Sequence, residues 1–177
     1  MAIQHNITTP ASEITTDPSQ IEPARIVLLK TPLSVSMDLF QVLDFCQRHI
    51  DELIDCHDHT GRMALYGRLY AGLEVLKVVL KTPLPAHLIE RLTVDVKTDD
   101  NEYRCPLSTD SETLRAYCAA LTMLLMQGDQ SFDQEEHISG LLFELLDVLV
   151  EDLKAPRFVR VSTGLAIIGG EVNPEIH

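Results

Sequence analysis

Several features that identify common protein classes are missing from this sequence. It has no tryptophan, and aromatic residues make up only 5% of the chain, so the core must be built mainly from Leu, Val, Ile and Ala. No apolar run approaches the roughly 20 residues that cross a bilayer. Residues 1–24 also lack the basic region and the apolar run of a secretory signal. We therefore expect a cytoplasmic protein that does not associate with membranes.

Cysteine is present, but its spacing does not suggest a disulfide framework. Cys46, Cys56, Cys105 and Cys118 are spread over the chain in apolar or mixed surroundings. In a cytoplasmic protein such residues are usually buried thiols. We expect no native disulfide.

Motifs for catalysis and for phosphate binding are also missing. The chain has no Gly-x-Ser-x-Gly sequence, and Gly169-Gly170 is not followed by Lys-Ser or Lys-Thr. No acidic residue has a histidine three positions later, which excludes the usual di-iron bundle pattern. The candidate acid–base residues His49, His87 and His137 lie on polar or mixed helix faces, where histidines are usually solvated. We therefore predict a non-enzymatic protein with no catalytic residue and no cofactor.

One cluster resembles a metal site. Cys46, His49, Cys56 and His59 form two successive Cys-x-x-His sequences, and zinc requires four ligands within about 2.0 to 2.3 Å of one point. On a continuous helix Cys46 and Cys56 would lie roughly 15 Å apart along the axis, so they cannot share a metal ion. We expect no metal. In this interpretation His57 completes an apolar stripe and His59 helps to end the helix.

A different metal site remains an alternative. Asp55 and His59 would lie one helical turn apart and could bind a metal with ligands from elsewhere. This alternative corresponds to a metal-site enzyme that uses the Asp55/His59 region.

The hydrophobic pattern predicts a mainly α fold with one domain. Residues 1–24 are rich in Ser, Thr and Pro and are expected to form a flexible tail. Residues 25–168 are expected to form a single helical domain, and residues 169–177 a loose C-terminal tail. Apolar residues at steps of three and four predict four principal helices in a bundle-like arrangement. The helices are expected over Met37–His57 and Arg62–Lys81, from Thr109 to Gly128, and from the end of Ser131-Phe132-Asp133 to Pro156.

Specific residues are expected to start and end these helices. Ser36 would cap the first helix, and Thr109 with Glu112 would form a capping box for the third. Gly128 is a typical C-terminal stop. A short helix is also expected from Pro85 to Arg91.

Short β segments are expected near both ends of the domain. Ile26–Leu29 and Phe158–Val161 have β-type composition and are expected to pair with each other. Leu92–Val96 is expected to form a hairpin with Tyr103–Cys105, with an extended loop as the alternative. Leu165–Ile168 is expected to follow Phe158–Val161 as another strand, and Leu33–Ser36 forms a strand or leads into the first helix. An α+β variant of the fold therefore remains an alternative.

Two glycines fall inside the second predicted helix. Glycine in a helix interior costs up to about 1 kcal/mol relative to alanine. Gly67 and Gly72 are therefore expected to lie where another helix approaches closely.

Charge is the most informative global property. The net charge is −13, which disfavours direct binding to nucleic acids and to anionic membranes. No Lys or Arg occurs between Arg115 and Lys154, whereas many acidic residues do. Glu144, Asp147 and Glu151 are spaced three and four residues apart, so they share one helix face. Such a row is either a solubilising surface or an acidic docking face for a basic partner.

The favoured function is that of a small interaction or regulatory protein of the inhibitor, immunity or chaperone type. It would bind a basic protein through an apolar helical surface that includes Phe143 and has an acidic rim formed by Glu144, Asp147 and Glu151. A DNA-mimicking inhibitor of a nucleic-acid-binding protein is an alternative. Self-association into a homodimer is compatible with either, through the apolar fourth helix or the small residues of the second.

Overall fold

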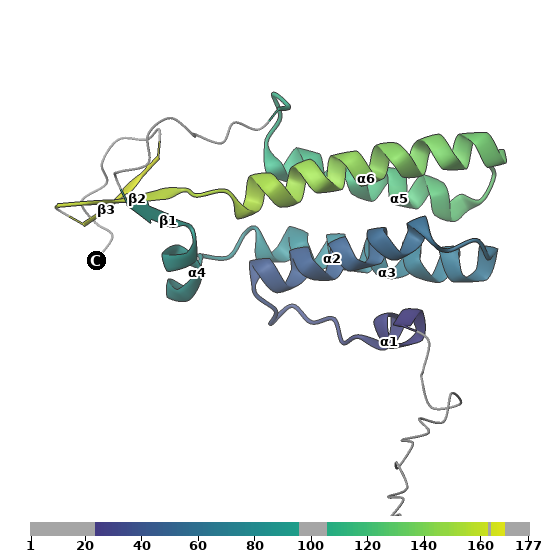
Figure 1. Cartoon of the computed structure of the whole chain (residues 1–177), viewed down its shortest axis with the longest axis horizontal. Helices are drawn as coiled ribbons and strands as arrows, with labels where there is room; N and C mark the ends of the chain where they lie inside the picture. The colour runs from purple at the N-terminus through teal and green to yellow at the C-terminus, as the bar shows by residue number, and fades with distance from the viewer. Residues whose placement is uncertain (1–23, 96–105, 163, 169–177) are drawn as a thin grey trace, which may run out of the picture.

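The computed structural model describes residues 24–95, 106–162 and 164–168. The fold is mainly helical with one small sheet (Figure 1). The elements in chain order are α1 (Ala24–Lys30), α2 (Leu39–Ile54), α3 (His59–Val79), α4 (Ala86–Arg91), β1 (Thr93–Asp95), α5 (Ser111–Gln127), α6 (Phe132–Lys154), β2 (Phe158–Val161) and β3 (Gly164–Ile167). Apart from Ala24, the expected tails at 1–24 and 169–177 lie outside the described residues.

The four long helices form a bundle of two helical hairpins. α2 packs against α3, α5 packs against α6, and α3 packs against α5. α2 also contacts α6, and this contact is the least extensive of the four. In Figure 1, α2 and α6 lie in front of α3 and α5. The four principal helices predicted from the sequence are therefore confirmed.

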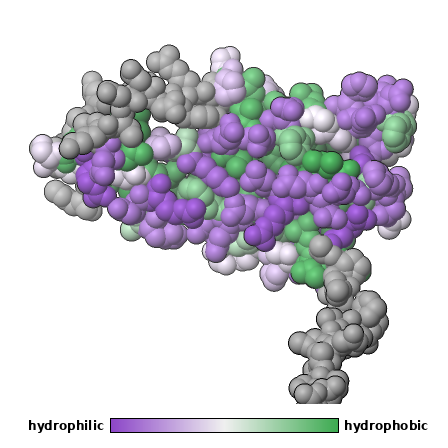
Figure 2. Space-filling model, viewed as in Figure 1, coloured by the Kyte–Doolittle hydropathy of each residue, from purple (hydrophilic) through white to green (hydrophobic). Residues whose placement is uncertain are grey.

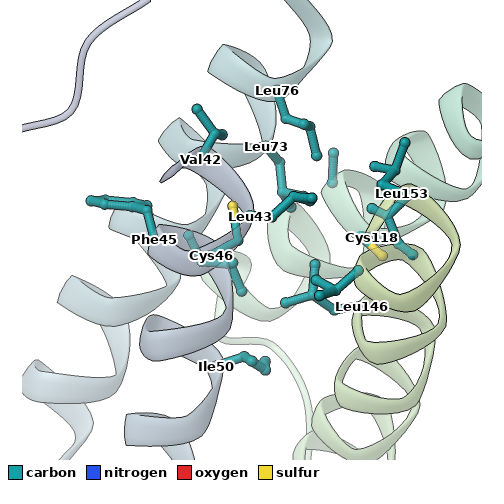
Figure 3. Packing of buried hydrophobic residues seen from close by; sticks show 14 of the residues in the cluster. Val42, Leu43, Phe45, Cys46, Ile50, Leu73, Leu76, Cys118, Leu146 and Leu153 are labelled. Carbon is teal, nitrogen blue, oxygen red and sulfur yellow. The ribbon is translucent and has the colours of Figure 1, made fainter. Parts of the chain in front are cut away.

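Leucine dominates the core, as the shortage of aromatic residues requires. Leu43, Leu73 and Leu146 come from three different helices and are almost completely buried (Figure 3). Cys46 and Cys118 lie in the same core as free thiols, and burial raises the pKa of each to about 12. Both thiols are therefore protonated at neutral pH and serve as small apolar side chains.

Gly72 and Gly67 differ in their surroundings, although both lie in α3. A Cβ atom on Gly72 would lie 2.8 Å from Cys46 Sγ and 2.9 Å from Phe45 Cδ1 of α2. The expected close approach of helices therefore occurs at Gly72. The same expectation for Gly67 is wrong, because the nearest atom to a Cβ there would be the Met126 methyl group at 4.0 Å.

Two of the predicted helix caps are displaced. α2 begins after Asp38, two residues beyond Ser36, and Asp38 forms a capping box with Gln41. α5 begins after Asp110, whose carboxylate accepts a hydrogen bond from the Thr113 amide, instead of after Thr109. In both cases an aspartate close to the expected cap takes the role, because its carboxylate also interacts favourably with the helix dipole.

Other predicted boundaries are also displaced: α2 ends at Ile54, before His57, and α3 spans His59–Val79 instead of Arg62–Lys81. α6 begins directly after Ser131, earlier than the predicted start after Asp133, and Ser131 forms a capping box with Gln134. The predicted stop at Gly128 is confirmed. Gly128 follows α5 with a φ of 70°, a left-handed conformation that glycine adopts readily.

The prediction of a strand at Ile26–Leu29 is wrong, because these residues belong to α1. Leu28 and Leu29 pack against the bundle core, while Arg25 forms ion pairs with Glu52 at 3.0 Å and Asp58 at 2.9 Å. The periodicity of an apolar run of only four residues does not show whether the run forms a strand or a buried helical turn. Leu33–Ser36 is also not a strand; it leads toward α2.

Among the described residues, the sheet therefore forms from β1 near the middle of the domain and from β2 and β3 near its C-terminal end. β2 lies in the middle and pairs with β1 in parallel and with β3 in antiparallel orientation. The expected pairing of Phe158–Val161 with Ile26–Leu29 is wrong, whereas the β2–β3 hairpin is confirmed. The proposed partner strand of Leu92–Val96 at Tyr103–Cys105 lies outside the described residues. Within the described part of the chain, no helix has both the length and the apolar character needed to cross a membrane.

Candidate functional site

A groove of about 610 Å³ lies at the end of the bundle where α2 ends and α3 and α6 begin, on the right in Figure 1. Its apolar lining comes from Ile50, Leu53 and Ile54 of α2 and from Phe132 and Phe143 of α6. Ile54 and Phe132 remain 64% and 79% exposed. Large apolar side chains gathered at an open groove are typical of a surface that binds another molecule.

Arg62 organises the polar floor of the groove. Its Nε donates to Glu135 Oε1 at 2.7 Å, and its Nη2 donates to Tyr66 Oη at 2.7 Å. The remaining amino group, Nη1, lies 3.2 Å from the Cys56 carbonyl oxygen and 3.4 Å from that of Leu53. Arg62 thus joins the end of α2, the start of α3 and the start of α6.

The same floor includes two hydroxyl groups that bond to each other. Tyr66 Oη and Ser139 Oγ are 2.9 Å apart, and Ser139 also accepts a hydrogen bond from Arg62 at 3.3 Å. Burial raises the pKa of the Tyr66 hydroxyl, which keeps it protonated at neutral pH. The guanidinium and both hydroxyls therefore hold the helices together, and their partners are supplied by the protein itself.

Carboxylates form the rim of the groove and continue along the α2–α6 contact. Glu136 and Glu144 line the groove itself. Beyond it, burial and the negative charge of Asp147 raise the pKa of Asp51 on α2, so two carboxylates of like charge face each other across the two helices. Figure 2 shows that hydrophilic side chains cover most of this face, with smaller hydrophobic patches among them. A cation placed here would relieve this repulsion.

The structure places the predicted docking residues in two groups. Glu144, Asp147 and Glu151 are all exposed on α6, and Phe143 is partly buried. Only Phe143 and Glu144 line the groove, whereas Asp147 and Glu151 lie further along the helix. Lys154 closes the far end of this row through an ion pair with Asp44 at 2.7 Å.

Sequence reasoning missed three residues of the groove. Ile54 lies off the apolar stripe of its helix, and Phe132 is the first residue of α6, immediately after the cap. An exposed apolar residue at a helix end is a usable signal for such a surface. The role of Arg62 could not be recognised from the neighbouring sequence, because its partners Glu135 and Ser139 lie more than seventy residues away along the chain.

The histidines near the groove differ from their predicted roles. His57 does not complete the apolar stripe: α2 ends at Ile54, and His57 is exposed. His59 does not help to end that helix but begins α3, directly after the cap residue Asp58. Instead, the Arg62 guanidinium donates to the carbonyl oxygen of Leu53 near the end of α2 and to that of Cys56 just beyond it.

The residues of the two metal-site patterns lie in different environments. Cys46 and His49 are buried along α2, whereas Asp55 and His59 are exposed at the α2–α3 turn. Among the described residues, no three or more His, Cys, Asp or Glu side chains are grouped so that they could hold a metal ion.

The expectation that His49 is solvated is wrong, because the residue is completely buried, and its set of hydrogen-bond partners is incomplete. Its Nδ1 donates to the Phe45 carbonyl oxygen at 2.7 Å, and its Nε2 has no hydrogen-bond partner among the described residues. Burial lowers its pKa, and the nearby Arg68 guanidinium lowers it further. His49 is therefore held neutral in the core, which makes folding sensitive to pH.

We expect the free energy of unfolding to fall as the pH drops below about 6.5. The unfolded chain then takes up a proton at position 49 before the folded chain does. For this single group, the free energy of unfolding can change by up to about 1.4 kcal/mol per pH unit. Urea denaturation between pH 5.5 and 7.5 would measure it, and His49→Gln should remove this part of the slope. The same change at the exposed His137 should leave the slope as in the wild type; equal slopes in all three proteins would contradict the prediction.

The groove combines exposed apolar side chains, a closed hydrogen-bond network and an acidic rim. The polar groups of the floor already satisfy one another, so the groups left open at the groove are apolar side chains and carboxylates. The chain matches no protein-family model, and neither a curated protein nor a solved structure matches it.

Proposed function

We propose that this protein binds a basic partner protein through the groove between α2 and α6. The partner would present a short amphipathic segment whose apolar side chain enters beside Ile54 and Phe132 and whose Lys or Arg residues face Glu136 and Glu144. The observation that carries the proposal is the combination of exposed apolar side chains with carboxylates at one open groove. An amphipathic helix in a groove is a common mode of protein recognition.

Charge favours a basic partner over the other possible occupants. The net charge of −13 makes a second copy a poor fit for an acidic rim. Residues 1–23 contain Glu13, Asp17 and Glu22 and no Lys or Arg, so this segment does not complement the rim either. A basic partner would be steered toward the groove, which raises the association rate and makes it depend on salt.

The proposed function is that of small regulatory proteins such as inhibitors, immunity proteins and chaperones. A DNA mimic is less well supported, because its carboxylates would not surround large apolar side chains. A metal-site enzyme has no support from the exposed Asp55 and His59. The cytoplasm is the proposed location, since the cysteines of the described part, Cys46, Cys56 and Cys118, are all free and buried.

The test uses a labelled amphipathic helical peptide with Leu and Phe on one face and Lys on the other. We expect wild-type protein to bind it more weakly as salt rises, because exposed charges are screened within about 8 Å at physiological ionic strength. Replacing Glu144, Asp147 and Glu151 together with Lys should weaken binding at low salt by tenfold or more. Fluorescence anisotropy at two salt concentrations measures both effects.

A matched control distinguishes the effect of where the charges lie from the effect of the net charge on binding. Reversing Glu90, Glu112 and Asp129 to Lys changes the net charge by the same amount on other surfaces, and should reduce binding much less. Phe132→Ser should also weaken binding, since it removes the most exposed apolar side chain of the groove. If the two triple variants lost the same amount of peptide affinity, or if the wild type did not bind the peptide, the proposal would fail. The row of Glu144, Asp147 and Glu151 would then be only a solvated surface.

A further inference from the structure

The outward surface of α5 is apolar and carries no charge over most of its length. Tyr117, Met123 and Leu124 are 51%, 42% and 37% exposed, and Ala116 and Ala120 are exposed beside them. Arg115, the one charged residue between Glu112 and the end of the helix, is buried and turns toward the Leu73 carbonyl oxygen and Glu74 of α3. An uncharged helix face of this kind is unusual on a chain with a net charge of −13.

These residues form one stripe. The α5 face, as we define it, comprises Thr113, Ala116, Tyr117, Ala120, Met123, Leu124 and Gln127. The steps of three and four residues repeat every seven positions, which is the pattern of a helix that packs against another helix along its length. The residues that α5 buries within the bundle, such as Cys118 and Thr122, lie on the opposite side. The bundle itself therefore leaves this stripe unpaired.

We propose that the α5 face binds the same face of a second copy, forming an antiparallel two-fold dimer. In a two-fold dimer each surface meets itself, so a surface without charge avoids the repulsion that two acidic copies would otherwise experience. The stripe itself carries no carboxylate that a basic partner could contact; Asp129 and Asp133 border it at Leu124. The second copy is therefore the occupant that the charge distribution favours.

The sizes of the side chains determine whether the α5 helices of the two copies run antiparallel or parallel. Ala116 and Tyr117 lie toward the N-terminal end of α5, Met123 and Leu124 lie toward its C-terminal end, and Ala120 lies between the two pairs. In an antiparallel pair with Ala120 near the symmetry axis, Leu124 of one copy meets the small Ala116 of the other, and Met123 meets Tyr117 in a sulfur–aromatic contact. A parallel pair would place Tyr117 against Tyr117 and Leu124 against Leu124, and would leave the alanines without contacts.

The two surfaces that the sequence suggested for self-association fit a dimer less well. The outward surface of α6 carries Glu144, Asp147 and Glu151, which would meet like charges. The small-residue line of α3 is used within the chain, because Gly72 lies against Phe45 and Cys46. α5 and α2 lie diagonally in the bundle, so a dimer through α5 leaves the groove accessible.

The oligomeric state of the full chain tests the proposal. Sedimentation equilibrium should give a mass of about twice the 19.8 kDa of one chain. Ala120→Glu, which places two carboxylates at the symmetry axis, should shift the protein to the monomer mass. Phe132→Glu adds the same charge at a more exposed apolar residue on the groove and should remain dimeric. A monomeric wild type, or two variants that behave alike, would overturn the proposal.

Cross-linking tests the direction in a Cys105→Ser background. Ala120→Cys should form a disulfide-linked dimer under mild oxidation, because the two copies of position 120 approach each other at the axis. Gln127→Cys should not, since the antiparallel arrangement places the two copies of position 127 at opposite ends of the interface. Cross-linking of both variants would indicate a parallel pair and contradict the antiparallel arrangement. Circular dichroism spectra of all variants would confirm that the helices are intact.

Discussion

Replacing Gly72 with leucine should lower the free energy of unfolding by about 3 kcal/mol, at the upper end of the usual cost of overpacking a core. A Cβ atom alone would lie 2.8 Å from Cys46 Sγ and 2.9 Å from Phe45 Cδ1. The Phe45 ring has little room to move, because the His49 ring lies 4.1 Å away and the Arg68 guanidinium 5.0 Å away. Urea denaturation of the variant and the wild type would measure the difference.

Gly67 provides the control in the same helix. Nothing lies closer than the Met126 methyl group, at 4.0 Å from a Cβ atom. Gly67→Ala should therefore raise the free energy of unfolding by up to about 1 kcal/mol through the higher helix propensity of alanine. Gly72→Ala should lower it. If both alanine variants shifted stability in the same direction, the difference in packing between the two positions would be refuted.

Replacing Arg62 with methionine should lower the free energy of unfolding by about 3 kcal/mol, which is typical when a partly buried charged partner is removed. The change leaves the Glu135 carboxylate without its 2.7 Å partner and removes the hydrogen bonds to the carbonyl oxygens of Leu53 in α2 and Cys56 just beyond it. The methionine retains much of the apolar stem, so the effect reports the lost polar contacts. Thermal and urea denaturation would both show it.

Lys81→Met is the matched control for this change. Lys81 pairs with Glu112 at 3.7 Å, and both side chains are largely exposed. Exposed pairs contribute roughly 0 to 1 kcal/mol, so the control should remain close to the wild type. A double-mutant cycle with Glu135→Gln should give a coupling of at least about 1 kcal/mol with Arg62. Additive effects of the two changes would show that the network does not act as a unit.

The helices could be predicted from the sequence because each carries its own signal. The stripes of leucine and the stop at Gly128 are local patterns, and they define the bundle without knowledge of distant contacts. The cap positions could not be predicted in the same way, since Asp38 lies two residues after Ser36 and Asp110 lies directly after Thr109. Each aspartate is as suitable a cap as the residue that was expected. The choice depends on backbone geometry that residue type alone does not determine.

The sheet and the groove could be predicted only in part, because both depend on contacts between distant segments. Val94 pairs with Val159, and no local pattern in either strand identifies the other. Ile26–Leu29 has the composition of a strand but folds as a helix because Arg25 and two leucines attach it to the bundle. In the groove, the acidic row of α6 could be recognised from its spacing, but the facing Ile54 and the Arg62 network could not.

The parallel pairing of β1 with β2 has a mechanical consequence. β1 follows the α2–α3 hairpin and α4, and β2 follows the α5–α6 hairpin, so this pairing fastens the two hairpins together at one end of the bundle. At the opposite end the contact between α2 and α6 rests on side chains, chiefly those around Arg62. The two hairpins are also joined by the α3–α5 contact, whereas the α2–α6 contact on the other side is the least extensive of the four. The groove lies on this sparser side and at the end away from the sheet, so its width depends mainly on the Arg62 network.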